Sequence, residues 1–325
     1  MCTSIALRTP SFLFGRNLDL ECAFGQRVVI APRRFPFVWR MAGRMTSHYA
    51  LIGIAAVQDG YPLFAEAANE KGLCMAGLNF PGNAYYDPED APGKRGVSPF
   101  ELIPFLLGQC ADVAAVRALL REIHIVAVPF SEKTPLSPLH WHIADKDCSI
   151  VLETTRDGMR VYDNPADVMT NNPTFDFHLT NLRQYMNVTS AYAVNRLSDR
   201  LSLTPFCNGL GGIGLPGDLS SASRFVRAAF MTANTPRLPD EAAGVAQFFH
   251  LLDSVAMPMG SVITREGLSE ITDYACCFSA ASQTFYYKTY RNSQLTAVRL
   301  AGESLDADAL REFPLRDEQA VRYEN

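Results

Sequence analysis

The second residue of the chain is a cysteine, and its position offers chemistry that an internal cysteine lacks. Met1 is followed by a small side chain, the usual setting for removal of an initiator methionine. The mature chain would then begin at Cys2, with a thiol and a free α-amine on one residue. Model α-amines and thiols titrate at roughly 8 and 8.5, so the amine can serve as base for the thiol near neutrality. Position alone also allows the alternative that Cys2 is an arbitrary second residue.

Two charged residues that follow Cys2 are candidates to support this chemistry. Residues 2–8 and 12–18 read as two strands joined by a turn. If they pair as a hairpin, Arg16 and Asp19 return to the start of the chain. A guanidinium near a thiol favours the thiolate, and a carboxylate can hold the amine in place. Taken by themselves, these two residues would be interpreted as an ordinary surface ion pair.

The other motifs favour structural roles. The glycines in GLGGIG (209–214) match a dinucleotide-binding pattern, but they lead into LPGD (215–218), where such a site needs a helix. We therefore expect a flexible loop there. His140 and His142 would share one face of a strand, without a third ligand placed by the sequence, so we expect no metal site. A Cys–His catalytic pair stays open, because nothing in the sequence selects one.

Composition excludes several classes of protein. With 48% hydrophobic and 19% charged residues, the chain of 325 residues can bury a core and is not disordered. The net charge of -5 argues against a nucleic-acid partner. The longest clean apolar run, 49–57, is far below the ~20 residues that span a bilayer, and no secretory signal is evident, so we expect a cytoplasmic protein. Eight cysteines without a C-x-x-C pair predict free thiols, seven of them small buried residues.

The predicted elements come in blocks of strands and blocks of helices. Strands are expected at 2–8, 12–18, 27–32, 49–57, 73–80, 139–144, 149–154, 159–162, 274–281, 283–290 and 295–300. Helices are expected at 98–108, 112–123, 176–187, 223–233 and 240–257, with Ser98 and Asp112 as N-caps. Such blocks favour antiparallel sheets with helices outside over a doubly wound parallel sheet. Length alone suggests about two domains, but no linker or repeat divides the chain, so we expect one domain over 1–325.

Five motifs, in order, resemble the choloylglycine hydrolase family of N-terminal nucleophile (Ntn) amidases, which includes bile salt hydrolases and penicillin V acylases. The motifs are MCTS, FGRNLD, NEKGLCMAGLNFPG (69–82), MTNNPTFDFH (169–178) and LPGDLSSASRFVRAAF (215–230), and LHW at 139–141 and TFYYKTY at 284–290 extend the similarity nearly end to end. The resemblance implies an α+β fold, an αββα sandwich of two antiparallel sheets between helical layers. It also implies a homotetramer, helped by an extension between about 187 and 217, and no metal or organic cofactor.

The resemblance assigns roles residue by residue. It implies that Cys2, exposed by loss of Met1, is the nucleophile. The residues that would support it are Arg16 and Asp19 beside the thiolate and amine, Asn79 and Asn171 as donors to the oxyanion, and Arg224, which completes the site. Removing one oxyanion donor typically costs about 10²–10³ in rate.

The resemblance narrows the substrate to an amide. Penicillin V acylases tend to carry tyrosine where this chain has Asn79, which favours bile acids conjugated to glycine or taurine. Loops at about 20–27, 58–63 and 128–138 would supply apolar walls, with Leu20, Phe24, Tyr61, Phe130 and Leu136 as substrate-binding residues. Many bile salt hydrolases have an aromatic residue where Cys22 stands here.

Other functions remain open at this point. A phenoxyacetyl or fatty acyl group would also suit an apolar wall. Penicillin V acylase and N-acyl-homoserine lactone acylase are therefore alternatives with the same machinery. A non-catalytic binding protein that retains Met1 is a more distant one.

Overall fold

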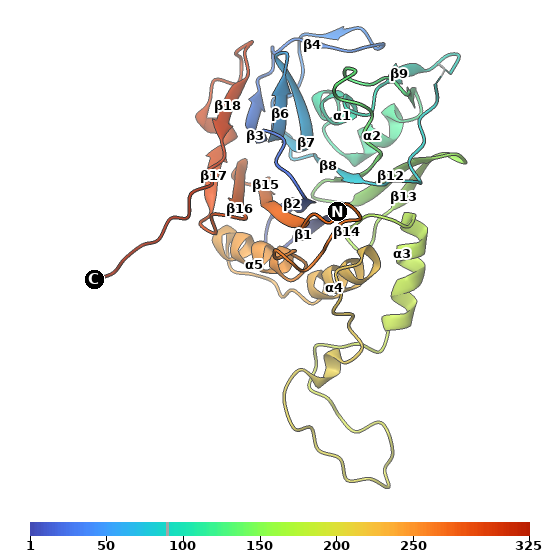
Figure 1. Ribbon diagram of the computed structural model, residues 1–325, viewed down its shortest axis with the longest axis vertical. Coiled ribbons are helices and arrows are strands. Elements are labelled where there is room, and N and C mark those ends of the chain that lie inside the picture. Colours follow the sequence, from blue (N-terminus) through green and yellow to red (C-terminus); the bar gives the residue numbers. More distant parts are fainter. Residues whose placement is uncertain (89–90) are drawn as a thin grey trace.

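Two stacked antiparallel sheets form the centre of the molecule (Figure 1). The computed structural model describes residues 1–88 and 91–325. One sheet has six strands, in the order β14 (Val168–Met169), β1 (Cys2–Arg8), β2 (Phe12–Leu20), β15 (Ile271–Ser279), β16 (Thr284–Thr289) and β17 (Thr296–Arg299). The other has eight, in the order β13 (Gly158–Asp163), β12 (Ser149–Thr155), β11 (Leu139–Ala144), β8 (Cys74–Asn79), β7 (Tyr61–Asn69), β6 (Leu51–Gln58), β3 (Arg27–Ala31) and β18 (Arg311–Pro314).

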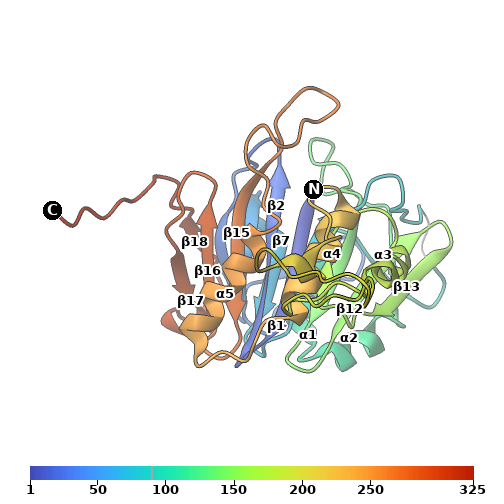
Figure 2. The ribbon, with the colours of Figure 1, turned by 90° about the horizontal axis from the view of Figure 1, so that it is seen from below.

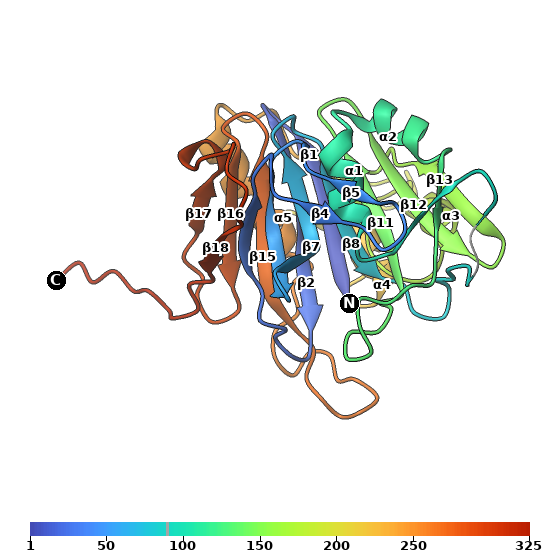
Figure 3. The same cartoon turned by 90° about the horizontal axis from the view of Figure 1, so that it is seen from above.

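Helices cover the outer faces of both sheets. Helices α4 (Ser221–Ala233) and α5 (Glu241–Asp253) lie across the six-stranded sheet, with α3 (Phe175–Leu182) beside α4 (Figure 2). Helices α1 (Leu102–Gln109) and α2 (Val113–Leu119) lie on the side of the eight-stranded sheet (Figure 3). Two short two-stranded sheets complete the fold, β4 (Phe37–Val38) with β5 (Arg44–Met45), and β9 (Arg95–Val97) with β10 (Ile123–Ile125). The predicted αββα sandwich of class α+β is confirmed.

Strand alternation separates the core into two layers. In β3, Val28 and Ile30 face the interior between the sheets, whereas Val29 and Ala31 pack toward α1 and α2. Successive side chains of a strand point to opposite faces, so a strand buried on both sides is a continuous apolar run. The eight-stranded sheet is therefore a wall between two apolar layers.

The hairpin that carries Cys2 forms as predicted. Strand β1 pairs with β2 so that Cys2 lies opposite Leu18 and Ser4 opposite Arg16. Strand β2 runs two residues beyond the predicted end, to Leu20. This extension places Asp19 within the sheet, where its N–H donates to the Met1 carbonyl at 2.9 Å.

Several element boundaries differ from the predictions for local reasons. The N-cap of α1 is Glu101 and not Ser98, whose N–H instead donates to the Glu101 carboxylate at 3.1 Å. Asp112 does cap α2, accepting from the Ala115 N–H at 2.8 Å. Helix α3 ends at Leu182, because the next three residues form a 3₁₀ turn. The largest miss is β7, which lies in a segment for which no strand was expected.

A long segment between α3 and α4 extends away from the sandwich (Figure 1). Its glycine-rich motif forms one 3₁₀ turn, Leu210–Gly212, and then irregular chain, so the predicted loop is confirmed. Cys207, in this segment, is exposed, as are Cys22 and Cys148, which corrects the expectation that seven cysteines are buried. Within the described residues, no single helix is long and apolar enough to cross a membrane, and only the bent pair α1 and α2 reaches that length and composition together.

Candidate active site

Cys2 lies at one end of an apolar cavity of about 420 Å³ between the two sheets. The residue is only 3% exposed, so its sulfur meets solvent through this cavity. Polar side chains from three strands, Cys2 on β1, Arg16 on β2 and Asn79 on β8, line the same end. The remaining wall is largely apolar, which limits the chemistry to this end.

Arg16 connects the Cys2 sulfur to the backbone of the eight-stranded sheet. Its side chain is fully buried, and its Nη2 donates to Cys2 Sγ. Its Nη1 donates to the carbonyls of Gly77 at 2.5 Å and Ala65 at 3.3 Å. The guanidinium is thereby held in one orientation, with its charge directed at the sulfur. Such an arrangement favours a thiolate over a thiol.

Asp19 lies beside the start of the chain, on the far side from Arg16. Its Oδ1 accepts from the Thr272 hydroxyl at 2.6 Å, and its Oδ2 is 3.9 Å from Arg224 Nη1. Among the described residues, Oδ2 has no hydrogen-bond partner although it is buried. Burial raises the pKa of the Asp19 carboxyl, and the nearby Arg224 guanidinium opposes that rise. A buried acceptor without a partner can receive an ammonium group.

The terminal amine of Met1 occupies the space next to Asp19. It donates to the Asp19 carbonyl at 2.7 Å and also contacts the Glu270 carboxylate. Burial lowers the pKa of this amine from its usual value. An amine placed here is therefore easier to deprotonate than one in water.

Asn171 and Arg224 hold the backbone of Cys2 from the other side. The Cys2 N–H and Arg224 Nη2 both donate to Asn171 Oδ1 at 2.8 Å. Arg224 Nη1 donates to the Cys2 carbonyl at 2.5 Å and to the Thr3 hydroxyl at 2.6 Å. Arg224 is fully buried on α4, whose first turn is capped by Ser220. Segments over 200 residues apart in sequence thus meet at the backbone of Cys2.

The two asparagines provide donors near the sulfur. Asn171 Nδ2 donates to the Asn79 carbonyl at 2.7 Å. A side-chain amide has two N–H groups, so one remains for another acceptor. The Asn79 side chain is half-buried and lines the cavity beside Cys2. Together they can stabilise negative charge that develops on a bound carbonyl.

Four of the five predicted wall residues line the cavity: Leu20, Phe24, Phe130 and Leu136. Tyr61 does not. Its ring packs behind the wall against Phe100 and Phe130, at centroid distances of 5.7 Å each. Wall residues that sequence reasoning missed include Leu18, Leu63, Ile103 and Phe100. Ile103 and Phe100 belong to α1 and the turn before it, whose approach depends on tertiary packing.

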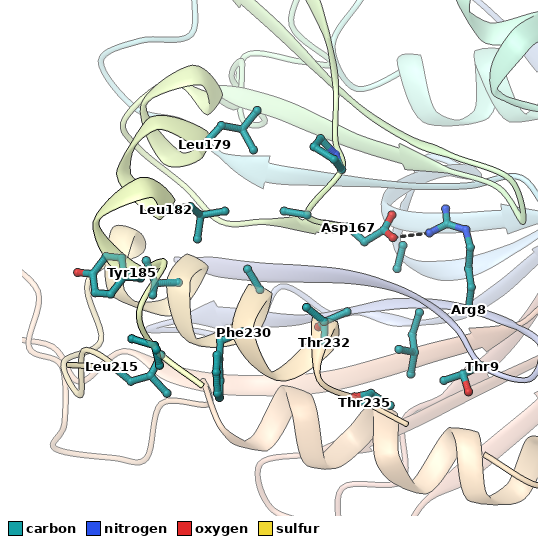
Figure 4. A pocket seen from close by; sticks show the side chains of 18 residues that line it. Arg8, Thr9, Asp167, Leu179, Leu182, Tyr185, Leu215, Phe230, Thr232 and Thr235 are labelled. Carbon is teal, nitrogen blue, oxygen red and sulfur yellow. Dashed lines mark hydrogen bonds and ion pairs between the residues drawn. The ribbon is translucent and has the colours of Figure 1, made fainter. Parts of the chain in front are cut away.

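A second cavity of about 510 Å³ lies on the helical side and lacks this chemistry (Figure 4). Its apolar walls come from Leu179, Leu182 and Phe230, and the Arg8–Asp167 ion pair, 2.5 Å long, closes one end. Among the described residues that line it there is no cysteine or histidine. It is a groove between α3, α4 and the base of the extended segment, and we do not assign the chemistry to it.

His140 and His142 share one face of β11, and both bind protein groups. His140 bonds to the Glu153 carboxyl at 3.1 Å and the Thr170 carbonyl at 3.0 Å. His142 bonds to two serine hydroxyls, of Ser4 and Ser149. Burial lowers the pKa of each imidazole to about 3. In the described part of the chain, no group of three His, Cys, Asp or Glu side chains is arranged to hold a metal.

Two relatives match this chain over almost its whole length, and a third matches it over part of its length. A bile salt hydrolase/transferase from Lactiplantibacillus plantarum is 46% identical over 318 residues, 98% of this chain and 98% of that protein. A protein of the same name from Clostridium perfringens is 38% identical over 330 residues, with full coverage of both chains. A penicillin V acylase from Pectobacterium atrosepticum is 27% identical over 234 residues, 66% of this chain and 56% of that one.

Solved structures show the same relationship. A mutant of the conjugated bile acid hydrolase from Clostridium perfringens superposes over 100% of both chains with a TM-score of 0.93 and 38% identity. A penicillin V acylase from Agrobacterium tumefaciens, 20% identical, shares the fold with a TM-score of 0.78 over 99% of this chain and 94% of that one. The model of the linear amide C-N hydrolases, choloylglycine hydrolase family, matches residues 2–313. The chain therefore belongs to the choloylglycine hydrolase family, and is a hydrolase of linear amide C–N bonds.

Proposed function

We propose that this enzyme hydrolyses the amide bond of bile acids conjugated to glycine or taurine, with Cys2 as the nucleophile. The observation that carries the proposal is the Cys2 sulfur, held by Arg16 at the end of a largely apolar cavity. A rigid steroid body needs an apolar wall of this kind, with polar groups only near the bond that is cleaved. The relatives at 46% and 38% identity carry names that agree with this substrate class.

The reaction would begin with attack of the Cys2 thiolate on the amide carbonyl. The carbonyl oxygen becomes an oxyanion, which the free N–H of Asn171 Nδ2 and the Asn79 side chain would stabilise. The α-amine of Cys2, having taken the thiol proton, gives it to the departing nitrogen of glycine or taurine as the C–N bond breaks. Water then attacks the thioester, releasing the bile acid and regenerating the thiol.

This mechanism requires the removal of Met1. In this structure Glu270 contacts the amine of Met1, whereas the Cys2 nitrogen that removal of Met1 would free donates to Asn171 Oδ1 at 2.8 Å. Asp19 Oδ2 has no hydrogen-bond partner among the described residues. A Cys2 ammonium would be stabilised by the negative charge of the Asp19 carboxylate. Intact-mass measurement of the purified protein should show loss of one methionine. Retention of Met1 in a protein without amidase activity would favour the non-catalytic alternative.

A substrate panel tests the proposal. We expect glycocholate and taurocholate to be hydrolysed faster than penicillin V and N-acyl-homoserine lactones. Cys2→Ala should abolish hydrolysis, and Cys148→Ala should not, because Cys148 is exposed in a turn far from the cavity. Faster turnover of penicillin V or of a lactone would refute the substrate assignment, and an active Cys2→Ala variant would refute the mechanism.

We also propose that the chain assembles as a homotetramer through its extended segment, residues 186–220. Large apolar side chains there are exposed in the single chain, among them Leu197 at 77% and Phe206 at 88%. Apolar side chains gathered in this way on a projecting segment are typical of an interface. A reducing, cytoplasmic location suits the same protein, because all eight cysteines are free thiols.

A further inference from the structure

A buried carboxyl group lies directly behind Arg16, where the mechanism above does not use it. Glu66 on β7 is 2% exposed, and its Oε2 is 3.7 Å from Arg16 Nη1. The Tyr274 hydroxyl donates to both carboxyl oxygens, at 2.8 and 3.1 Å. Arg16 thus has an acidic group on one side and the Cys2 sulfur on the other.

A β-bulge directs Glu66 to this position. The pairing of β6 with β7 shifts between Ile54 and Ala55, so that Ile54 faces Glu66 while Ala55 faces Phe64. Ala65 is the extra residue, and its carbonyl accepts from Arg16 Nη1. In a regular strand, side chains two residues apart point to the same face. Phe64 packs toward α1, so without the bulge Glu66 would point toward α1 as well. The bulge instead turns Glu66 toward Arg16, and bulges are enriched beside active sites for this purpose.

The groups around Glu66 leave Arg16 as its counter-ion. Arg16 faces it from β2, Tyr274 and Cys276 from β15, and the backbone of Ile54 from β6. Burial keeps the pKa values of Tyr274 and Cys276 well above their usual range, so both stay neutral. Burial also raises the pKa of Glu66 to about 7, and the Arg16 charge opposes that rise. The carboxyl group therefore changes charge near neutrality.

We propose that Glu66 is a positioning residue that acts on Cys2 through Arg16: its charge state sets how much of the Arg16 charge acts on the sulfur. The proposal rests on the proposed role of Cys2 as nucleophile. Below neutrality Glu66 carries a proton and Arg16 acts on the sulfur alone. Above neutrality the carboxylate shares the guanidinium with the sulfur, since one buried cation then faces two anions. Arg16 remains fixed in both states by its bonds to the Gly77 and Ala65 carbonyls.

The test compares the alkylation of Cys2 by iodoacetamide in the wild type and in Glu66→Gln across pH. Glutamine keeps the shape of the neutral carboxyl group but cannot ionise. We expect the two proteins to be alkylated at equal rates at about pH 5.5, where both side chains are neutral. At about pH 8.5 the Glu66→Gln variant should be alkylated about threefold or more faster than the wild type, because its Arg16 acts on the sulfur alone. Alkylation needs no bile salt, so this result stands even if the substrate proposal fails.

Two further variants separate charge from packing. Glu66→Asp keeps the charge and should restore the wild-type pH dependence of the alkylation rate, even if all rates fall. Glu70→Gln, which changes a partly buried carboxylate paired with Arg33 instead of Arg16, should follow the wild type at every pH. A wild-type to Glu66→Gln ratio that stays constant from about pH 5.5 to 8.5 in folded protein would overturn the proposal.

Discussion

Asn171 combines two tasks that different substitutions can separate. Its Oδ1 accepts from the Cys2 N–H and from Arg224, which orients the nucleophile. Its Nδ2 has the N–H that we assign to the oxyanion. Loss of the whole side chain removes both tasks, whereas aspartate keeps the acceptor and loses the donor.

We therefore predict that Asn171→Ala and Asn171→Asp both lower kcat by about 10²–10³, because each removes an oxyanion donor. Alkylation of Cys2 should slow in the alanine variant, which also loses the acceptor, and change less in the aspartate variant. Steady-state hydrolysis of glycocholate and iodoacetamide kinetics measure the two effects. Asn172→Ala is the matched control, since Asn172 bonds to the Pro81 carbonyl outside the site. Activity of Asn171→Asp near the wild-type level would refute the donor role.

The buried histidines predict that the folded state loses stability as the pH falls. Burial lowers the pKa of His142 from 6.5 to about 3, so the folded state keeps it neutral while the unfolded chain protonates it below about pH 6.5. Each such histidine should therefore lower the free energy of unfolding by roughly 1.4 kcal/mol per pH unit as pH falls from 6.5 toward 3.

The measurement is urea unfolding of the wild type and His142→Gln between about pH 7 and 4. Glutamine can bond to the two serine hydroxyls that flank the imidazole. The variant should lose stability less steeply than the wild type. Burial raises the pKa values of Glu66 and Glu153 from 4.5 to about 7. Between these two values the carboxyl groups stabilise the folded state as pH falls, which opposes the effect of the histidines. This contribution is the same in both proteins. Parallel pH curves would contradict the prediction.

At the scale of elements, close strand contact positions Arg16. A Cβ on Gly15 would lie 1.9 Å from the Cys276 carbonyl oxygen, and one on Gly53 would lie 2.0 Å from that of Glu66. Both contacts are to backbone, which cannot move without shifting a strand. Gly15 precedes Arg16 on β2, and Gly53 pairs with Ala67, next to the bulge that directs Glu66.

We predict that Gly15→Ala destabilises the protein by about 3 kcal/mol or more, because β2 and β15 must separate. Hydrolysis should fall together with stability, since Arg16 moves with β2. Thermal unfolding and glycocholate turnover measure the two losses. Gly217→Ala is the control, because a Cβ there meets no atom within 4 Å. Wild-type stability of Gly15→Ala would show that the strands can accept the methyl group.

The elements also show which features could be predicted from the sequence. The hairpin of β1 and β2 follows from local alternation and a turn, so it could be predicted, apart from the last two residues of β2. Strand β7 could not, because four of the five residues in FAEAA at 64–68 are Ala or Glu, which are depleted in strands, and only pairing with β6 and β8 makes them extended. For the same reason Glu66 reads as an ordinary exposed acid in the sequence. Arg224 and Asn171 were found from motifs of the family, since no local pattern brings them to Cys2.

At the scale of the whole molecule, the segment 186–220 is the part whose surface does not suit an isolated chain. It extends from the sandwich between α3 and α4, and its base forms one wall of the groove in Figure 4. Leu197, Leu203 and Phe206 are at least half exposed, at 77%, 50% and 88%. Apolar area of this extent costs free energy in water unless a second chain covers it.

We predict that changing Leu197, Leu203 and Phe206 together to serine converts the proposed homotetramer to smaller species. Each substitution removes apolar area that assembly would bury, worth about 1.5–3 kcal/mol for a fully buried side chain. Size-exclusion chromatography with light scattering gives the mass of wild type and variant at equal concentration. Val321→Ser, in the exposed chain end, is the matched control and should leave the mass unchanged. A wild type that is monomeric over micromolar concentrations would refute the assembly, and a triple variant that stays tetrameric would place the interface elsewhere on the surface.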